Sequence, residues 1–306
     1  MTSREIRTLV IAVILFGLAA LLPFSGNGYF ISIGVTIAMY VVLSTSWALF
    51  SGPTHYISLA TAAFYGLGTM IVATGIETVP YVVLLLISAV AGALMAALVG
   101  LATLRLSGVY FVIFTLGLAE MIRQLVSWLQ NNLGGSRGLY VLTDLTEDHI
   151  YWELLALAAF VFLIGWWIGR SRLGFAMRII GNDETVAAHC GINTARSKIM
   201  LFMVSGMVAA LVGALLAPRW TYIEPNIAFS PLLSFEVVIM ALLGGTKRLW
   251  GPLVGVVPFT ILLEVIEANY PSQTILVLGI AFLLIVYLVP HGVVGRLEQS
   301  FAKFRR

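Results

Sequence analysis

The sequence has few charged residues and a single cysteine. Asp, Glu, Lys and Arg make up only 10% of its 306 residues, whereas they form about a quarter of a soluble domain. Hydrophobic residues make up 60%, which is more apolar surface than a soluble two-domain enzyme of this size can bury. The lone Cys190 excludes an internal disulfide and a cysteine-based metal site.

The motifs of common catalytic sites are also missing. No G-x-x-x-x-G-K-[ST] phosphate loop occurs, so the chain is not expected to hydrolyse ATP, and no G-x-S-x-G elbow occurs. The four histidines are scattered and match no metal-ligand spacing. We therefore expect no enzymatic activity, catalytic residue, cofactor or metal in this chain, and no nucleic-acid partner.

Long apolar runs dominate the chain instead. A membrane-spanning helix needs about 20 mostly apolar residues. The predicted fold class is therefore an all-α, polytopic transmembrane helical bundle, with residues 1–306 as one domain. The first, eighth and ninth runs are short, so we expect eight to ten spans. The candidate spans are 8–23, 29–50, 55–76, 80–104, 108–130, 150–169, 199–218, 230–246, 251–267 and 273–290.

The distribution of basic residues predicts the orientation, because cytoplasmic loops are enriched in Lys and Arg. With an internal N-terminus and ten crossings, 14 of the 17 Lys and Arg residues lie inside. Both termini are then cytoplasmic. These 14 residues are Arg4, Arg7, Arg105, Arg170, Arg172, Arg178, Arg196, Lys198, Lys247, Arg248, Arg296, Lys303, Arg305 and Arg306.

The two halves of the chain show a weak internal similarity. Span 29–50 with the Gly-rich 52–76 resembles span 199–218 with 230–251. Because each half holds five candidate spans, a repeat of this kind would be inverted in topology, as in many transporters. The largest external loop, 131–149, is either a solvated connector or a rim for an external partner.

Residues 170–198 form a polar island between apolar runs, and five basic residues place it in the cytoplasm. Asn182 is expected as a helix N-cap, with Asp183 and Glu184 in the first turn and Gly191 just past the end. This predicts a helix over 183–190. Such a short helix is marginal alone in water, so it either docks on a partner protein or lies on the membrane.

Three apolar segments carry polar features with functional potential. Segment 52–74 holds many small residues, which permit close helix packing or line a pathway, and Gly52-Pro53 is expected to break its helix. Glu120 lies midway along its span, where an acid is costly; it either pairs with Arg123, lines the path or carries a proton.

The third segment is 234–255. Glu236 is expected near the outer end of its span. A sharp cytoplasmic turn comes next, formed by Gly244, Gly245, Lys247 and Arg248.

Four stretches resemble the membrane permease subunits of bacterial branched-chain amino acid ABC importers, and are most similar to the M-type subunit. The third stretch is the most specific. They are GPTHYISLATAAFYGLGT (52–69), RLSGVYFVIFTLGLAEMIRQ (105–124) with GGSRGL (134–139), SRLGFAMRIIGNDETVAAHCGINTARSKIMLF (171–202) and SFEVVIMALLGGTKRLWGPLVG (234–255).

This resemblance implies a set of partners and a location. An M-type permease pairs with an H-type permease in the bacterial inner membrane. Two cytoplasmic ATPases bind the ATP, and a periplasmic binding protein delivers the substrate. Residues 170–198 would be the coupling loop on an ATPase, and its implied residues are Gly174, Arg178, Asn182, Asp183, Glu184, Ala187 and Gly191.

The pathway itself stays a hypothesis, and three functional classes stay open. Residues expected to line it are Ser58, Phe64, Thr115, Glu120 and Glu236. The first class is the ABC permease for Leu, Ile or Val, with urea or short amides as alternative substrates of related permeases. The others are a proton-coupled secondary transporter that uses Glu120 and a non-transporting membrane scaffold.

Overall fold

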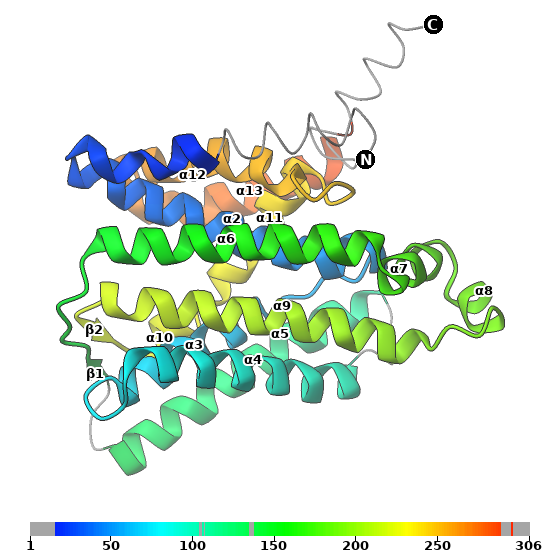
Figure 1. Cartoon of the computed structure of the whole chain (residues 1–306), viewed down its shortest axis with the longest axis horizontal. Helices are drawn as coiled ribbons and strands as arrows, with labels where there is room; N and C mark the ends of the chain where they lie inside the picture. The colour runs from blue at the N-terminus through cyan, green and yellow to red at the C-terminus, as the bar shows by residue number, and fades with distance from the viewer. Residues whose placement is uncertain (1–15, 104–105, 107, 135–137, 289–294, 296–306) are drawn as a thin grey trace, which may run out of the picture.

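The chain folds into a bundle of long helices, shown by a computed structural model in Figure 1. The structure describes residues 16–103, 106, 108–134, 138–288 and 295. Within this part, seven helices are long and apolar enough to cross a membrane, and two further apolar helices are shorter. The predicted all-α class is thus confirmed, and the chain is a multi-pass membrane protein.

The helices and strands form a single series along the chain, in which η marks 3-10 or π turns. Residues 16–20 are also helical. The bounds are η1 Leu22–Ser25, α2 Gly28–Thr54, α3 Thr61–Gly75, α4 Tyr81–Thr103, α5 Val109–Leu129, η2 Gln130–Gly134, β1 Leu139–Tyr140, α6 Glu147–Arg170, α7 Arg172–Asn182, α8 Glu184–His189, α9 Thr194–Leu216, η3 Ala217–Arg219, β2 Tyr222–Ile223, α10 Pro225–Ala228, α11 Pro231–Gly244, α12 Gly251–Asn269, η4 Pro271–Gln273 and α13 Thr274–Leu288.

Helices α2, α3 and α9 form the centre of the bundle. Val35, Val42 and Leu43 of α2 are fully buried, as is Val208 of α9. Small residues let α3, α4 and α9 approach closely: Gly92 of α4, for example, lies directly against α9. In lipid, where no hydrophobic force draws helices together, this tight packing is the main source of stability.

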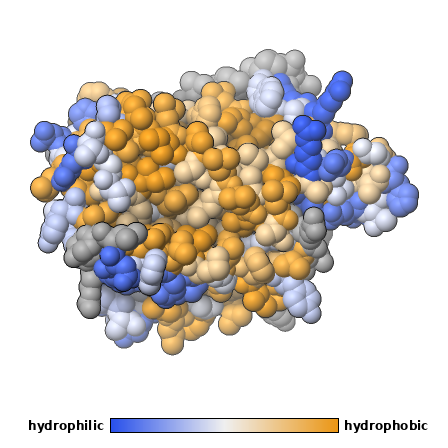
Figure 2. Space-filling view, turned by 90° about the horizontal axis from the view of Figure 1, so that it is seen from below, coloured by the Kyte–Doolittle hydropathy of each residue, from blue (hydrophilic) through white to orange (hydrophobic). Residues whose placement is uncertain are grey.

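The outer surface of the bundle is apolar across its middle. Figure 2 shows hydrophobic residues across the centre of one face and hydrophilic residues toward its two ends. Large exposed side chains such as Leu86, Leu94 and Leu98 of α4 and Ile113 of α5 contribute to this surface. A belt of this extent on a soluble monomer would be unstable in water, whereas lipid covers it at no cost.

The two ends of the bundle differ. At one end β1 pairs antiparallel with β2, and Arg219 Nε donates to Glu147 Oε1 over 3.1 Å. At the other end α7 and α8 project past the long helices (Figure 1). The turn after α11 lies at the same end as α7. Thr246 of this turn contacts Gly52 at the end of α2, and the neighbouring Pro53 contacts Gly181 of α7.

Two predicted boundaries are wrong. The helix expected to break at Gly52-Pro53 continues as α2 to Thr54 and ends where His55 adopts a left-handed conformation, with φ 59°. The span expected over 55–76 begins as a helix only at Thr61. Side chains from other helices bond to the backbone of 55–60, so this stretch can stay non-helical inside the protein.

Some predictions fall outside the described residues. The first candidate span, 8–23, is described only from residue 16. Eight basic residues also lie outside the described part of the chain. They are Arg4, Arg7, Arg105, Arg137, Arg296, Lys303, Arg305 and Arg306.

Candidate functional site

Helix α7 is anchored firmly to the rest of the bundle. The Ser171 hydroxyl accepts a hydrogen bond from the Gly174 N–H over 3.3 Å and so caps the helix. Gly174 lies beside the Ile168 carbonyl, where a larger residue would clash. Met177 and Ile180 are buried, so α7 packs firmly against the bundle and holds the start of α8 in place.

Helix α8 is short and well capped. Asp183, and not Asn182 as predicted, is its N-cap: the Asp183 carboxylate accepts from the N–H groups of Thr185 (2.8 Å) and Val186 (3.2 Å). Asn182 instead ends α7, because its backbone is still helical. Gly191 lies just past the end of the helix, as predicted, and is left-handed there, with φ 76°.

The electrostatics of this cap stabilise α8 at physiological pH. Hydrogen bonds from the Val186 and Thr185 amides hold the pKa of Asp183 below its ordinary value. Because this pKa is lowered, the ionised cap contributes its full stability to α8 above the ordinary aspartate pKa. This stability is lost only as the pH falls through the depressed pKa.

Replacing Asp183 with alanine is expected to loosen α8 without unfolding the bundle. The Thr185 and Val186 amides lose their acceptor, so they should exchange with deuterium several-fold faster than in the wild type. Asp183→Asn should restore most of the protection, because asparagine is an equally good N-cap. Equal protection in the alanine variant and the wild type would show that the cap does not hold α8.

Glu184 points back into the bundle. Lys198 Nζ, at the base of α9, donates to Glu184 Oε1 over 2.7 Å, and the Tyr56 hydroxyl donates to Glu184 Oε2 over 3.4 Å. The Lys198 side chain is only 3% exposed and its ammonium lies 4.7 Å from the centre of the Tyr56 ring. These contacts tie α8 to both α9 and the segment after α2.

The charge of Lys198 also sets the ionisation of Glu184. Burial alone would raise the pKa of Glu184, but the hydrogen bond and positive charge of Lys198 outweigh it and hold this pKa below its ordinary value. Glu184 therefore stays ionised near neutral pH.

The outward side of α7 and α8 has a different composition. Phe175 and Val186 are 60% and 52% exposed, and Arg178, Asn182, Ala188 and His189 of the same segment are also exposed. Ala187 is fully buried. We name the set Phe175, Arg178, Val186, Ala188 and His189 the outer hairpin face. Exposed apolar residues rimmed by polar ones, outside the apolar belt, are typical of a protein-binding surface.

The non-helical segment 55–60 is held by side chains from three helices. Its carbonyl at Ser58 accepts from the Trp47 indole over 2.8 Å, and the Leu59 N–H donates to Thr115 Oγ1 over 3.1 Å. Ser234 of α11 donates to the Leu59 carbonyl and accepts from the Ala62 N–H, each over 2.9 Å. Of the predicted residues, Thr115 thus bonds to the residue that follows Ser58, and Phe64 is buried in the first turn of α3.

Removing the Ser234 hydroxyl is expected to destabilise this region. Ser234→Ala leaves the buried Leu59 carbonyl and Ala62 N–H without this partner. The free energy of unfolding, measured by reversible denaturation in detergent, should fall by about 1–3 kcal/mol. Ser88→Ala is the matched control, because the buried Ser88 hydroxyl of α4 has no hydrogen-bond partner among the described residues. A loss of the same size in both variants would contradict the role given to Ser234.

Glu120 forms the ion pair predicted with Arg123. Arg123 Nε donates to Glu120 Oε2 over 2.8 Å, and a second, shorter bond joins Nη2 to Oε1. Arg123 also donates to Asn226 of α10, so the pair fastens α5 to α10. The Glu120 side chain is 42% exposed, and it lies outside the pocket between α2, α3, α10 and α11.

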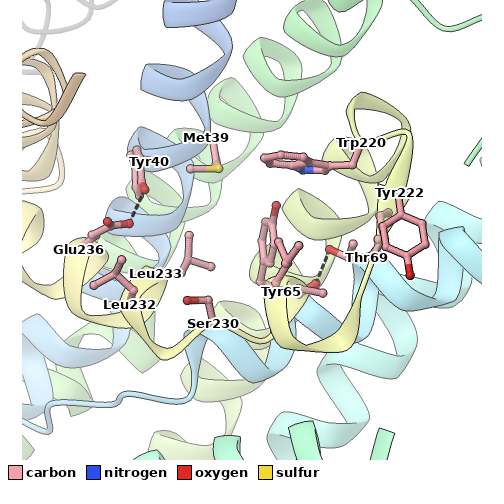
Figure 3. Close-up of a pocket in the computed structure, with 13 residues that line it drawn as sticks. Met39, Tyr40, Tyr65, Thr69, Trp220, Tyr222, Ser230, Leu232, Leu233 and Glu236 are labelled. Carbon is pink, nitrogen blue, oxygen red and sulfur yellow. Dashed lines mark hydrogen bonds between the residues drawn. The ribbon is translucent and has the colours of Figure 1, made fainter. Parts of the chain in front are cut away.

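This pocket, drawn in Figure 3, has a volume of about 200 Å³. Its lining includes Tyr222 and Ile223 of β2, so it lies at the β1–β2 end of the bundle. Glu236 lies at one end of the pocket, where its carboxylate accepts a short hydrogen bond from the Tyr40 hydroxyl. Trp220 and Tyr222 lie at the other end, and Tyr65 lies between. Of the predicted pathway residues, only Glu236 lines this pocket.

The turn after α11 has the predicted form. Gly245 has φ 104°, and Gly244 lies against the backbone of Gly251. Lys247 and Arg248 are exposed at its tip. This turn lies at the same end of the bundle as α7.

Several residues of these sites are not evident from the sequence. Tyr40 meets Glu236 across 196 positions, and Ser234 meets Leu59 across 175. No spacing rule predicts contacts of this range. For Lys198 the sequence gives a weak indication of an ion pair, because a lysine just inside a long apolar run needs an acidic partner.

Comparison with known proteins identifies the family. A family described as the permease component of branched-chain amino acid transport systems matches residues 29–289. LivM, a high-affinity branched-chain amino acid transport system permease protein of Escherichia coli K12, is 23% identical over 314 residues, covering 92% of this chain and 73% of LivM.

Other relatives match shorter stretches. LivH of Salmonella typhimurium, a permease protein of the same kind of system, is 29% identical over 165 residues, or 54% of this chain and 52% of LivH. This chain therefore spans about half the length of LivH. The ribose import permease protein RbsC of Haemophilus influenzae is 29% identical over 100 residues, 31% of either chain. No solved structure matches.

The family match covers most of the helical bundle, and the alignment with LivM extends over nearly the whole chain. The chain therefore belongs to the branched-chain amino acid ABC permease family and is LivM-like.

Proposed function

We propose that this chain is one half of the translocation pore of a bacterial ABC importer for branched-chain amino acids. It pairs with an H-type permease in the inner membrane. Two cytoplasmic ATPases drive the pair, and a periplasmic binding protein delivers the substrate. The observation that carries this proposal is the projecting hairpin α7–α8, which bears the outer hairpin face in a chain of the ABC permease family.

The proposed topology has ten crossings with both termini cytoplasmic, and its halves form an inverted repeat. The distribution of charge supports this orientation: exposed Arg178, Lys247 and Arg248 lie at the α7 end, as expected for the cytoplasmic side. Helix α3 is only 15 residues, about 22 Å long, so it crosses together with the non-helical segment 55–60.

The proposed coupling loop, 170–198, transmits motion in two steps. An ATPase holds the outer hairpin face. Movement of α8 then reaches the bundle through Glu184, which contacts Lys198 of α9 and Tyr56 of the segment before α3. That segment is bonded to α5 and α11 through Thr115 and Ser234, so both helices move with it.

Glu184 is consequently unsuited as a probe of docking. A Glu184→Lys change would place a second cation beside the buried Lys198 and disturb the permease itself. Substitutions on the outer hairpin face are the appropriate probes, because they leave the internal contacts unchanged.

The proposal is tested by isolating the complex from a native membrane. The tagged chain, extracted in mild detergent, should retain a second permease of similar size and P-loop ATPases, identified by mass spectrometry. Adding binding protein and substrate should raise ATP hydrolysis by this complex. Recovery of the chain alone, in a form that transports without ATP, would overturn the proposal.

A further inference from the structure

The buried acid Glu236 has no basic partner among the described residues, although a hydrogen bond from Tyr40 joins it to α2. It is 5% exposed on a membrane-spanning helix, where an ionisable group is costly and usually marks a substrate or ion pathway. Its described partner is Tyr40, whose hydroxyl donates to Oε2. No described lysine or arginine forms an ion pair with it.

The surroundings of Glu236 leave room for a cationic group. A carboxylate accepts several hydrogen bonds on its two oxygens, and Tyr40 supplies one of them. Glu236 lines the pocket, so a ligand there can reach the carboxylate. The lining residues include no lysine or arginine, and the nearby Arg219 is engaged by Glu147 and Ser32.

The rest of the pocket suits a small apolar group. Met39, Leu232 and Leu233 supply aliphatic contacts, and Tyr65 and Trp220 supply aromatic walls. The volume of about 200 Å³ is below the roughly 300–1,000 Å³ of sites for drug-sized ligands. The volume favours a small solute. The lining favours one with a cationic group at Glu236 and an aliphatic group elsewhere.

The pocket also lies where a solute would arrive. Trp220 and Ile227 at its rim are 47% and 55% exposed, whereas Tyr40 and Glu236 are buried. Its wall includes Tyr222 of β2, which lies at the opposite end of the bundle from α8 (Figure 1). If α8 meets the cytoplasmic ATPase, as proposed above, the pocket faces the outside.

We infer that this pocket binds the transported solute on its way through the pore and selects primary amines with an aliphatic side chain. The substrate ammonium donates to the Glu236 carboxylate, and its side chain packs among Met39, Leu232 and Leu233. Tyr40 is a positioning residue, since its hydroxyl fixes the carboxylate. The assignment deepens the proposed function and rests on it for the existence of the pore and for the direction of entry.

Photolabelling tests the site directly. The probe is a leucine analogue that carries a diazirine in its side chain, and its partner probe is the same carboxylic acid without the amino group. Each is irradiated with the reconstituted transporter complex, and labelled peptides are identified by mass spectrometry. The amine probe should label pocket peptides that contain Trp220 or Leu232, and excess leucine should protect them.

The variants make the test specific. In Glu236→Gln, labelling by the amine probe should fall about 10- to 100-fold, the loss expected for one charge-assisted hydrogen bond. Glu236→Asp should recover part of it. Glu153→Gln is the matched control, because Glu153 also accepts from a tyrosine, Tyr81 (3.0 Å), but lies outside the pocket. Each variant must still bind the ATPases, which shows that it is folded.

Three results would overturn the inference: equal labelling by the two probes, undiminished labelling in Glu236→Gln, or wild-type uptake of leucine with no label in the pocket. In the last case the proposed function stands and only the pocket fails. Amine-dependent, Glu236-dependent labelling in a complex that shows no ATP-driven leucine uptake would support the pocket while contradicting the proposed function.

Discussion

Val186→Asp is expected to abolish ATP-driven uptake while leaving the permease folded. Val186 is 52% exposed on α8 and belongs to the outer hairpin face. An aspartate there would have to be desolvated within the proposed ATPase contact without a partner, which costs several kcal/mol. Affinity for the ATPase should therefore fall by about 30-fold or more, the range of an interface hot spot. Co-purification of the ATPase measures this directly.

The control for this substitution lies at the opposite end of the bundle. Leu142→Asp introduces the same charge at a residue that is 72% exposed, in the segment between β1 and α6. It should leave the amount of bound ATPase unchanged. If Val186→Asp retains the wild-type amount of ATPase, α8 is not the docking element.

Gly68→Ala is expected to prevent stable packing of α3 against α9. A methyl group at Gly68 would lie 1.8 Å from the Ala210 carbonyl oxygen, far inside van der Waals contact. Because the obstacle is backbone, the two helices would have to separate. The overpacking should cost about 3 kcal/mol or more, even though alanine favours helix more than glycine does. The measurement is the yield of monodisperse protein and its midpoint in detergent denaturation.

The matched control is Gly117→Ala. Gly117 lies in α5, also within a spanning helix, but a methyl group there would meet no atom within 4 Å. This variant should be as stable as the wild type or slightly more so. Equal behaviour of the two variants would contradict the close α3–α9 contact.

Local features could be predicted from the sequence because they depend on neighbouring residues. The helix near 183–190 and its glycine end depend on capping groups within a few residues. The Glu120–Arg123 pair results from helical spacing, and the turn at Gly244-Gly245 from its glycines. The resemblance of the third stretch identified the family, which residue chemistry alone left open among three classes.

Features that depend on distant parts of the chain could not be predicted. The late start of α3 depends on Thr115 and Ser234, which belong to other helices. The pairing of Tyr40 with Glu236 requires α2 and α11 to be adjacent. The choice between Asn182 and Asp183 as N-cap was decided by where α7 ends, and no local residue preference separates these two residues.

The most direct test of the central claim is leucine uptake by proteoliposomes that contain the complete complex. Uptake should require the binding protein on one side and ATP hydrolysis on the other. It should persist when the proton gradient is collapsed, and it should remain ATP-dependent in Glu120→Gln, because Glu120 is engaged in an ion pair with Arg123. Uptake that proceeds without ATP, tracks an imposed pH gradient and disappears in Glu120→Gln would contradict the account.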